Sequence, residues 1–544
     1  MRAESTKMAG PHNQKHRSSR PVRRRWNSLK NTEKTGDSLK KLNRAAQFDK
    51  LSAGSVDAQH LEKRVLYEKR HSVNKKNLLI FLGIILAVFV AAAVVIAVSV
   101  SVKNRHDPDS TPGPDSGHEY LERFDEFSCV TVAAGANPAT AVNFCWQTYN
   151  GITDGFVRYA KKEGSAVTLP AETAKVEAYS ENTTFSVPVD GQFDYKNPSL
   201  QDVPAVLHRV YLTGLEPATE YVYTVGGTLP DGTVTESEPA VFRTVPEGDS
   251  FSFLLVADTQ GFTQRNYDVW GSLLSLALEK LPGFDFTVHM GDTVEEGKNA
   301  YQWQMYYNSS SGILGKIPTV SVVGNKDKKH ALSHFTNGAD GNRTALVSGY
   351  YSFDVGSVHF SVLNTGDGDK DLPKAQLKWL KADLEAAAGK HKIILIHKAP
   401  YSDANHCFDA EIVAIRSQIL PVANDYGVAA VLEGHDHYFF RSVPVNGQGA
   451  AADYNVSTVA VGGVDTKMFR VNGNGTVYFV NGSAGCRQHD NPIPGTADVL
   501  TDYSALMKGA SLSYVSVDGE KIVFTTYVNE NGTLKLYDSW GLYF

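Results

Sequence analysis

The stretch Val428-Ala-Ala-Val-Leu-Glu-Gly-His-Asp-His437 carries the pattern that decides the fold class. Its first five residues are apolar, which predicts a short buried strand. His435 and His437 follow that strand one residue apart, so both imidazoles would reach into one cleft. A pair of histidines on a loop also arises by chance, so recurrence of the pattern elsewhere in the chain decides whether it marks a binding site.

The same pattern occurs four more times upstream of this stretch. Apolar runs at 251–257, 286–290, 317–323 and 393–396 end at metal-binding residue types, namely Asp258, Gly291-Asp292, Gly324-Asn325 and His397. In open α/β sheets, ligands bind at the carboxyl ends of the strands. Two carboxylates, one amide and three imidazoles suit a pair of divalent or trivalent transition ions. The candidate metal ligands are therefore Asp258, Asp292, Asn325, His397, His435 and His437.

The segments between these strands have helical periodicity. Apolar residues at three- and four-residue spacing predict helices over 269–280, 374–388 and 411–426. Strands that alternate with such helices predict a layered α/β domain, which we place at residues 248–544.

A different pattern precedes this domain, over residues 127–247. Short alternating strands with turn signals are typical of an all-β sandwich. Val142, Phe144 and Trp146 alternate with polar positions and predict a buried face, with Cys145 on the opposite face. The segment 215–221 is similar to the tyrosine corner of fibronectin type III-like sandwiches. We expect a rigid spacer packed beside the catalytic cleft; ligand binding or adhesion is the alternative.

The order of the strand-end motifs resembles that of the calcineurin-like metallophosphoesterases, and more closely that of the purple acid phosphatases. The linking segments 351–360, 376–380 and 397–401 are also similar, and the resemblance extends from Ser128 to the C-terminus. It implies two packed mixed sheets with helices outside, and we expect the strands at 476–480, 513–517 and 522–527 to complete the second sheet. The larger purple acid phosphatases carry a sandwich domain ahead of the catalytic one.

The resemblance also implies a role for each ligand: Asp258 and His437 for a first metal ion, Asn325, His397 and His435 for a second, and Asp292 as the bridge. A shared anion offsets the repulsion between two cations about 3.5–4 Å apart. The implied ions are Fe, Zn or Mn, which lower the pKa of bound water so that a hydroxide attacks phosphorus. The implied activity is hydrolysis of phosphate monoesters. A phosphodiesterase or nucleotide-cleaving enzyme is one alternative, and a weakened enzyme serving as an adhesion or receptor protein is another.

Three positions depart from the family pattern. Glu295 stands three residues after Asp292, where purple acid phosphatases have a tyrosine, so we expect no ferric–tyrosinate colour. Gln260 is a candidate extra ligand. Lys326 follows Asn325, where most relatives have a histidine that helps to protonate the leaving group. We expect Lys326 and Asp292 to act in catalysis; a pseudoenzyme is the alternative.

Other titratable residues form weaker patterns. Ser402, Asp403 and His406 lie within five residues, but no nucleophile-elbow glycines surround the serine, which disfavours a catalytic triad. The remaining histidines of this domain that we expect to be structural or peripheral are His289, His330, His334 and His359.

The N-terminal segments predict a membrane anchor. Residues 1–77 hold 20 Lys and Arg against 7 Asp and Glu, lack sustained periodicity and indicate a disordered basic tail. Residues 78–102 carry no charge over 25 positions, enough to cross a bilayer of about 30 Å as a helix. Residues 103–126 are a Pro- and Gly-containing stalk. The positive-inside rule places the tail in the cytosol, which makes this a type II single-pass protein of the cell surface or of a secretory or endolysosomal lumen.

The sequons and cysteines agree with this topology, because all of them follow residue 102. The Asn-X-Ser/Thr sequons are at Asn182, Asn308, Asn342, Asn455, Asn474, Asn481 and Asn531. The four cysteines allow three pairings, of which we favour Cys129–Cys145 and Cys407–Cys486. The basic run at 20–25 could bind nucleic acid, but a cytosolic flank attracted to anionic lipid is the better interpretation beside a membrane span, so no nucleic-acid partner is expected.

Overall fold

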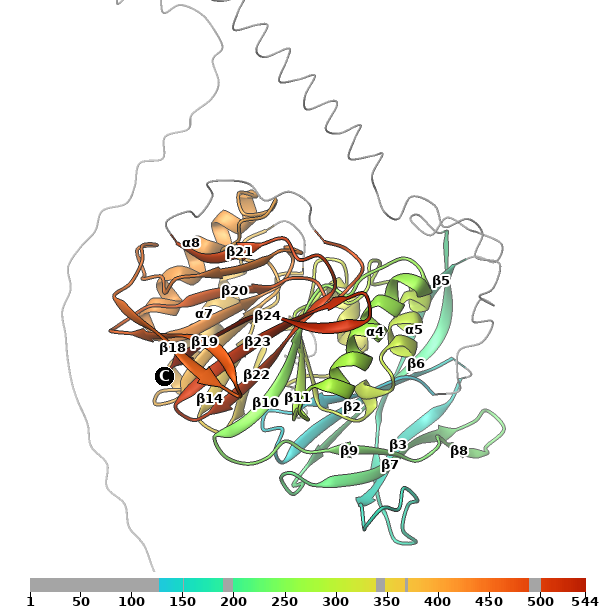
Figure 1. Ribbon diagram of the computed structural model, residues 1–544. Coiled ribbons are helices and arrows are strands. Elements are labelled where there is room, and N and C mark those ends of the chain that lie inside the picture. Colours follow the sequence, from blue (N-terminus) through green and yellow to red (C-terminus); the bar gives the residue numbers. More distant parts are fainter. Residues whose placement is uncertain (1–126, 150, 189–198, 339–347, 367–369, 489–499) are drawn as a thin grey trace, which may run out of the picture. The chain divides into compact units, whose positions relative to one another are not determined.

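The computed structural model describes residues 127–149, 151–188, 199–338, 348–366, 370–488 and 500–544 (Figure 1). The predicted tail, membrane span and stalk (1–77, 78–102 and 103–126) lie outside the described residues, and so does Asn342. Within the described ranges, no helix is both long and apolar enough to cross a membrane.

The N-terminal part is a β-sandwich, as predicted. Val142, Phe144 and Trp146 point into its aromatic core. The Glu216 main-chain N–H donates to the Tyr221 hydroxyl over 2.9 Å, the contact that defines a tyrosine corner. One sheet has the order β1-β2-β6-β5, and the other has β4-β3-β7-β8 with β9 paired to β7. The strands are β1 Ser128–Ala134, β2 Ala141–Thr148, β3 Thr153–Lys161, β4 Ala174–Glu177, β5 Tyr179–Pro188, β6 Leu200–Thr213, β7 Glu220–Thr228, β8 Val234–Glu236 and β9 Ala240–Arg243.

The catalytic part has two sheets packed face to face with helices outside, as the resemblance implied. Phe253 and Phe286 of one sheet meet Phe353 and Phe360 of the other in the core between them. A second core lies under α4 (Gln264–Lys280) and α5 (Ala300–Ser309), and a third under α7 (Lys374–Ala386) and α8 (Ala410–Asp425). Figure 1 shows the two helix pairs in different parts of the domain, each against its own sheet. Helix α5 was not predicted, because its aromatic and amide side chains give it little amphipathic contrast.

The two catalytic sheets are both mixed. The first contains β18-β19-β24-β23-β22-β10-β11-β12, and the second has the order β13-β14-β15-β16-β20-β17-β21. The prediction that the strands at 476–480, 513–517 and 522–527 complete the second sheet is correct for β20, which joins that sheet, and wrong for β22 and β23, which join the first. The strands are β10 Ser250–Val256, β11 Phe286–His289, β12 Thr319–Ser321, β13 Tyr351–Val355, β14 Val358–Val362, β15 His391–Ile396, β16 Val428–Glu433, β17 Phe439–Ser442, β18 Tyr454–Val461, β19 Val464–Val471, β20 Val477–Asn481, β21 Thr501–Ala505, β22 Ser511–Asp518, β23 Lys521–Glu530 and β24 Thr533–Tyr543.

The sandwich and the catalytic part share one sheet of 12 strands, which the sequence did not predict. Strand β1 runs parallel to β12, with Ala133 opposite Thr319. Side chains reinforce the junction: the Asn143 amide donates to the Thr336 carbonyl over 2.8 Å, and the Tyr223 hydroxyl donates to the Gly315 carbonyl over 2.8 Å. The sandwich therefore also braces the segment that follows Asn325.

The structure contains no disulfide bond among its described cysteines. The predicted pairings Cys129–Cys145 and Cys407–Cys486 are therefore not formed. On the β1–β2 pair, Cys145 lies opposite Thr131 rather than Cys129. The Cys145 thiol turns toward the catalytic part and donates to the Ser333 carbonyl over 3.3 Å. The Cys486 thiol lies 4.0 Å from the Gln260 carbonyl, at the candidate site.

The predicted sequons differ in accessibility. Asn481 is fully buried: its amide donates to the Leu255 carbonyl over 3.0 Å and accepts from the Ser513 hydroxyl. A glycan on Asn481 would require this packing to be broken. The prediction of a glycosylation site at Asn481 was therefore wrong. The exposed sequon asparagines are Asn182, Asn308, Asn455, Asn474 and Asn531.

Candidate metal centre

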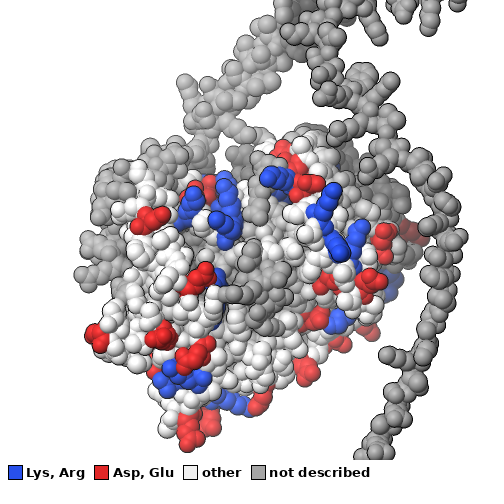
Figure 2. All heavy atoms as spheres, turned by 180° about the vertical axis from the view of Figure 1, so that it is seen from behind, with Lys and Arg blue, Asp and Glu red and all other residues white. Residues whose placement is uncertain are grey.

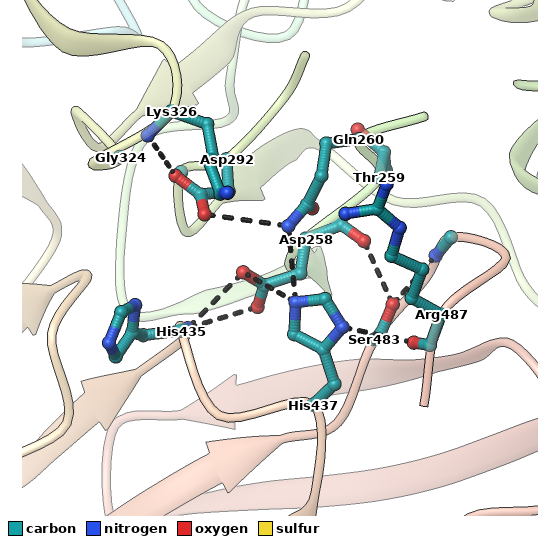
Figure 3. A network of polar contacts seen from close by, with 12 residues as sticks. Asp258, Thr259, Gln260, Asp292, Gly324, Lys326, His435, His437, Ser483 and Arg487 are labelled. Carbon is teal, nitrogen blue, oxygen red and sulfur yellow. Dashed lines mark hydrogen bonds and ion pairs between the residues drawn. The ribbon is translucent and has the colours of Figure 1, made fainter. Parts of the chain in front are cut away.

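The predicted ligands converge where strands of both sheets end. Asp258 follows β10, Asp292 follows β11 and Asn325 follows β12, in three neighbouring parallel strands of the first sheet. His397 follows β15, while His435 and His437 follow β16, in adjacent parallel strands of the second sheet. Main-chain contacts join the two groups, because the His435 N–H donates to both carboxylate oxygens of Asp258 over 3.2 and 3.1 Å (Figure 3).

The backbone turns tightly at this junction. Asp258, Asp292 and His435 have φ values of 56°, 52° and 70°, a left-handed conformation that costs energy for residues with a Cβ. A Cβ on Gly324 would lie 2.0 Å from the Asp292 main-chain nitrogen and 2.2 Å from its Oδ1. Because Gly324 has no Cβ, the loop after β12 can approach the Asp292 carboxylate in the loop after β11.

Asp292, His397 and His435 form the tightest cluster, with one ligand atom from each lying within 4.8 Å of the others. Asp292 Oδ1 accepts from the Lys326 main-chain N–H over 2.8 Å and lies 3.3 Å from His397 Nε2. The His397 Nδ1–H donates to the Met290 carbonyl over 2.8 Å, which directs Nε2 toward Asp292 and toward the Asn325 amide oxygen at 2.9 Å.

The protonation of this cluster fits a cation site. Burial raises the pKa of the Asp292 carboxyl, but the charge and hydrogen bond of His397, together with the Lys326 N–H and charge, outweigh burial and hold the pKa below its usual range. Burial lowers the pKa of His397, but Asp292, together with the charge of Asp258 and the Met290 carbonyl, outweighs burial and raises the pKa to about 9. Here a proton on His397 supplies the positive charge that Asp292 needs, and a metal ion would displace that proton on binding.

His435 gives the most direct test of whether the residues present fit a metal ion. Burial, followed by the charge of His397, holds the pKa of His435 well below its usual range, so its imidazole stays neutral. Among the described residues, its buried Nε2 atom has no hydrogen-bond partner. Buried polar atoms without partners are rare in folded proteins. A neutral, buried imidazole nitrogen beside a carboxylate has a lone pair that can coordinate a metal ion. The residues present therefore fit the predicted metal.

The other half of the site surrounds Asp258. His437 Nε2 lies 3.6 Å from Asp258 Oδ1, and the His437 Nδ1–H donates to the Arg487 main-chain carbonyl over 3.1 Å. The side-chain amide of Gln260 is buried between Asp292 and His437, and it approaches His437 Nε2 to 3.1 Å. Figure 3 shows Asp258, Gln260 and His437 side by side. Contacts of His397 with Asp292 and Asn325, and of His435 with Asp258, connect the remaining predicted ligands to this group.

Charged residues adjoin the candidate ligands in the same loops. Glu295, at the position of the family tyrosine, pairs with Lys326 Nζ at 3.0 Å and with Arg487 Nη1 at 2.7 Å. Sequence reasoning missed Arg487, because a single arginine in a loop carries no recognisable pattern.

His406 was also missed as a site residue. Its ring centroid lies 4.4 Å from that of His435, and its Nδ1 lies 2.7 Å from Asp409 Oδ2. The triad pattern that contained it does not form: the Asp403 carboxylate accepts from Thr501 over 3.0 Å, and the Ser402 hydroxyl accepts from the Ala404 N–H over 2.9 Å.

The buried histidines outside the centre have structural partners. His289 Nδ1 accepts from the Gly291 N–H over 3.2 Å, and burial lowers the pKa of His289 to about 3. His334 stacks on Trp303 with ring centroids 3.8 Å apart. His359 lies between two carboxylates.

Comparison with known proteins agrees with this geometry. Residues 128–244 match the family model of the purple acid phosphatase N-terminal domain, and residues 251–439 match that of the calcineurin-like phosphoesterases. The chain is similar to acid phosphatase type 7 of Danio rerio, with 28% identity over 54% of this chain and 68% of that one. It is also similar to purple acid phosphatase 23 of Arabidopsis thaliana, with 25% identity over 52% of this chain and 65% of that one.

Among solved structures, a purple acid phosphatase from yellow lupin (Lupinus luteus) seeds matches with a TM-score of 0.60 and 17% identity, over 77% of this chain and 74% of that one. At this identity the likeness shows the fold alone. The chain spans 68% of the Danio rerio relative and 59% of an uncharacterized Mycobacterium tuberculosis relative. The chain therefore contains a purple acid phosphatase N-terminal domain followed by a calcineurin-like phosphoesterase domain, and these matches support a metal-dependent phosphoric ester hydrolase.

Proposed function

We propose that this protein is a dinuclear metal-dependent phosphatase that hydrolyses phosphate monoesters. The observation that carries the proposal is the convergence of Asp292, His397 and His435 at one point, with the buried Nε2 of His435 lacking a partner among the described residues. Asp258, Gln260 and His437 gather on the adjacent side. When bound, two metal ions would neutralise phosphate charge and lower the pKa of a water molecule.

The surrounding residues position these ligands. Met290 fixes the ring of His397 through its carbonyl, and Arg487 fixes the ring of His437 in the same way. The Lys326 N–H holds one oxygen of Asp292, which leaves the second carboxylate oxygen directed toward Gln260 and the other ligand group. These supports set the direction of each ligand before a metal ion arrives.

Two side chains are candidates for protonating the leaving group. Lys326 follows a ligand directly, and its side chain is 38% exposed and paired with Glu295. His406 packs against His435 and is oriented by Asp409. General acid catalysis contributes about 10²–10⁴-fold to a rate, so removal of the residue that serves this role would be easily measured.

We further propose that the protein is membrane-anchored in type II orientation, with its catalytic part outside the cytosol. The support is the uncharged run at 78–102, its basic cytosolic flank and the exposed sequons beyond it. Protease treatment of sealed vesicles with the cytosolic face outward should leave the catalytic part intact. Digestion of that part in the same vesicles would rule out this orientation.

The face drawn in Figure 2 carries acidic and basic side chains interspersed.

The deciding experiment combines metal analysis with two assays on residues 126–544 produced in a secretory host. We expect two equivalents of transition metal and faster turnover of a phosphate monoester than of a diester. A preference for the diester would favour a phosphodiesterase. Protein that binds no metal and hydrolyses neither substrate would instead support the adhesion alternative.

A further inference from the structure

The approach to the metal centre contains an ion-pair arrangement that the family pattern does not assign. Glu295 receives one cation on each carboxylate oxygen: Lys326 Nζ on Oε1 at 3.0 Å and Arg487 Nη1 on Oε2 at 2.7 Å. The Arg487 guanidinium also lies over the Phe262 ring, 4.7 Å from its centroid. One carboxylate therefore pairs with two cations, one on each of its oxygen atoms.

Each cation is tied through its main chain to a different part of the metal centre. The Lys326 N–H donates to Asp292, whereas the Arg487 carbonyl accepts from His437. The loop that carries Arg487 is fixed as well, because the Ser483 hydroxyl donates to the Asp258 carbonyl over 2.8 Å and Gly485 packs against the same carbonyl. These contacts fix the main chain from which each cation extends, and Figure 3 shows Lys326 beside Asp292 and Arg487 beside His437.

Stability alone gives a weak reason for this arrangement. The side chains of Lys326 and Arg487 are 38% and 29% exposed, and exposed ion pairs contribute little to folding. Their exposure does allow them to meet a solute at the metal centre. The Glu295 side chain, at 12% exposure, is the more enclosed partner, as expected for the residue that holds the other two.

We propose that Lys326 and Arg487, held by Glu295, form a phosphate clamp that selects substrates with a terminal, doubly charged phosphate group. The inference rests on the proposed function and names its substrate class. A phosphate monoester presents three non-bridging oxygens and two charges, so oxygen atoms remain for the clamp beyond those that face the metal ions. A diester has one non-bridging oxygen fewer and one charge fewer. The planar guanidinium suits two phosphate oxygens at once, and the ammonium supplies a point charge.

Glu295 limits the strength of the clamp. It neutralises one of the two cations, so an incoming phosphate competes with it for the same donors. A neutral amide at this position would keep the shape of the side chain and release both charges. The clamp should then bind phosphate more tightly and release inorganic phosphate more slowly.

The test uses R487Q and E295Q in the full chain loaded with metal, and it measures the binding of inorganic phosphate by calorimetry together with kcat/KM for a monoester and a diester. The matched control is R158Q in the sandwich, because Arg158 also pairs with a glutamate at 2.6 Å and lies over a phenylalanine ring, 5.6 Å from its centroid. R487Q should weaken phosphate binding and lower the monoester-to-diester ratio by roughly ten- to hundredfold, the loss expected for hydrogen bonds to a charged group. R158Q should change neither quantity.

E295Q provides an independent test, because it should change the phosphate affinity in the opposite direction from R487Q. This test remains decisive if R487Q fails to fold. Its affinity for phosphate should rise several-fold. Unchanged phosphate affinity in folded R487Q or in E295Q would overturn the clamp, even if the enzyme hydrolyses monoesters. Loss of phosphate binding in R487Q, in a protein that hydrolyses neither substrate, would support the clamp and reject the proposed function.

Discussion

Replacing His359 should change how the stability of the catalytic part depends on pH. Its Nδ1 lies 2.7 Å from Asp354 Oδ1 and its Nε2 lies 2.9 Å from Asp383 Oδ2, so the ring ties β13 and β14 to helix α7. Burial lowers the pKa of His359, but the hydrogen bonds that its ring donates to the two carboxylates, together with their charges, outweigh burial and raise the pKa from 6.5 to about 9. Because the folded pKa is the higher one, the stabilisation is complete below pH 6.5 and is lost as the pH rises through 9.

The size of the effect follows from the shift. A difference of about 2.5 pKa units, at about 1.36 kcal/mol per unit, sets an upper limit of roughly 3 kcal/mol. Asp354 is 41% exposed, so water screens its charge, and we expect about 1–2 kcal/mol. Urea unfolding of the wild type and H359Q at pH 6 and pH 9.5 measures it, since groups common to both proteins cancel in the double difference. D354N should give an intermediate value. Equal pH dependence in the wild type and H359Q would refute the assignment of the charge to His359.

Three further predictions concern the metal centre. D292N should lower both metal occupancy and turnover, because a neutral amide cannot offset two cations, whereas N325A should do less harm; full metal content and rate in D292N, measured by metal analysis and assay, would contradict a bridging role. With Glu295 at the tyrosine position, the metal-loaded protein should show no intense visible charge-transfer band in an absorption spectrum, and a purple sample would mean that another tyrosine reaches the metal. K326A should slow the hydrolysis of alkyl phosphates by about 10²–10⁴-fold and that of an activated aryl phosphate far less, and K326H should retain the rate. Equal small losses on both substrates would leave protonation of the leaving group to His406.

The parts of the fold that local patterns specify were predicted from the sequence. The strands that end at Asp258, Asp292 and His397 were found because each is a short apolar run that ends in a polar residue, and burial on both faces requires such a run. The six candidate ligands were predicted for the same reason. The sandwich was evident from the alternation around Phe144, a period of two that only a strand with one buried face explains.

The missed features depend on contacts between residues far apart in the chain. Arg487 is recognisable only beside Glu295, which lies 192 positions earlier. His406 is recognisable only against His435, because no strand end precedes it. Asn481 matches a sequon, but the sequon does not record that this residue lies in a buried strand, next to Leu255 of another strand. Proximity across the fold, rather than residue type, separates these cases.

The sheet that β1 and β12 share has a consequence for how such proteins can evolve by exchange of modules. A recombination event that removed the sandwich would leave β12 as an open edge, with its N–H and C=O groups unpaired and ready to join another chain. It would also remove the partners that hold the segment behind Asn325, including the Asn143 amide that binds Thr336. A replacement module would have to bring a strand of matching register, so selection acts on the sandwich and the catalytic part as one inherited unit.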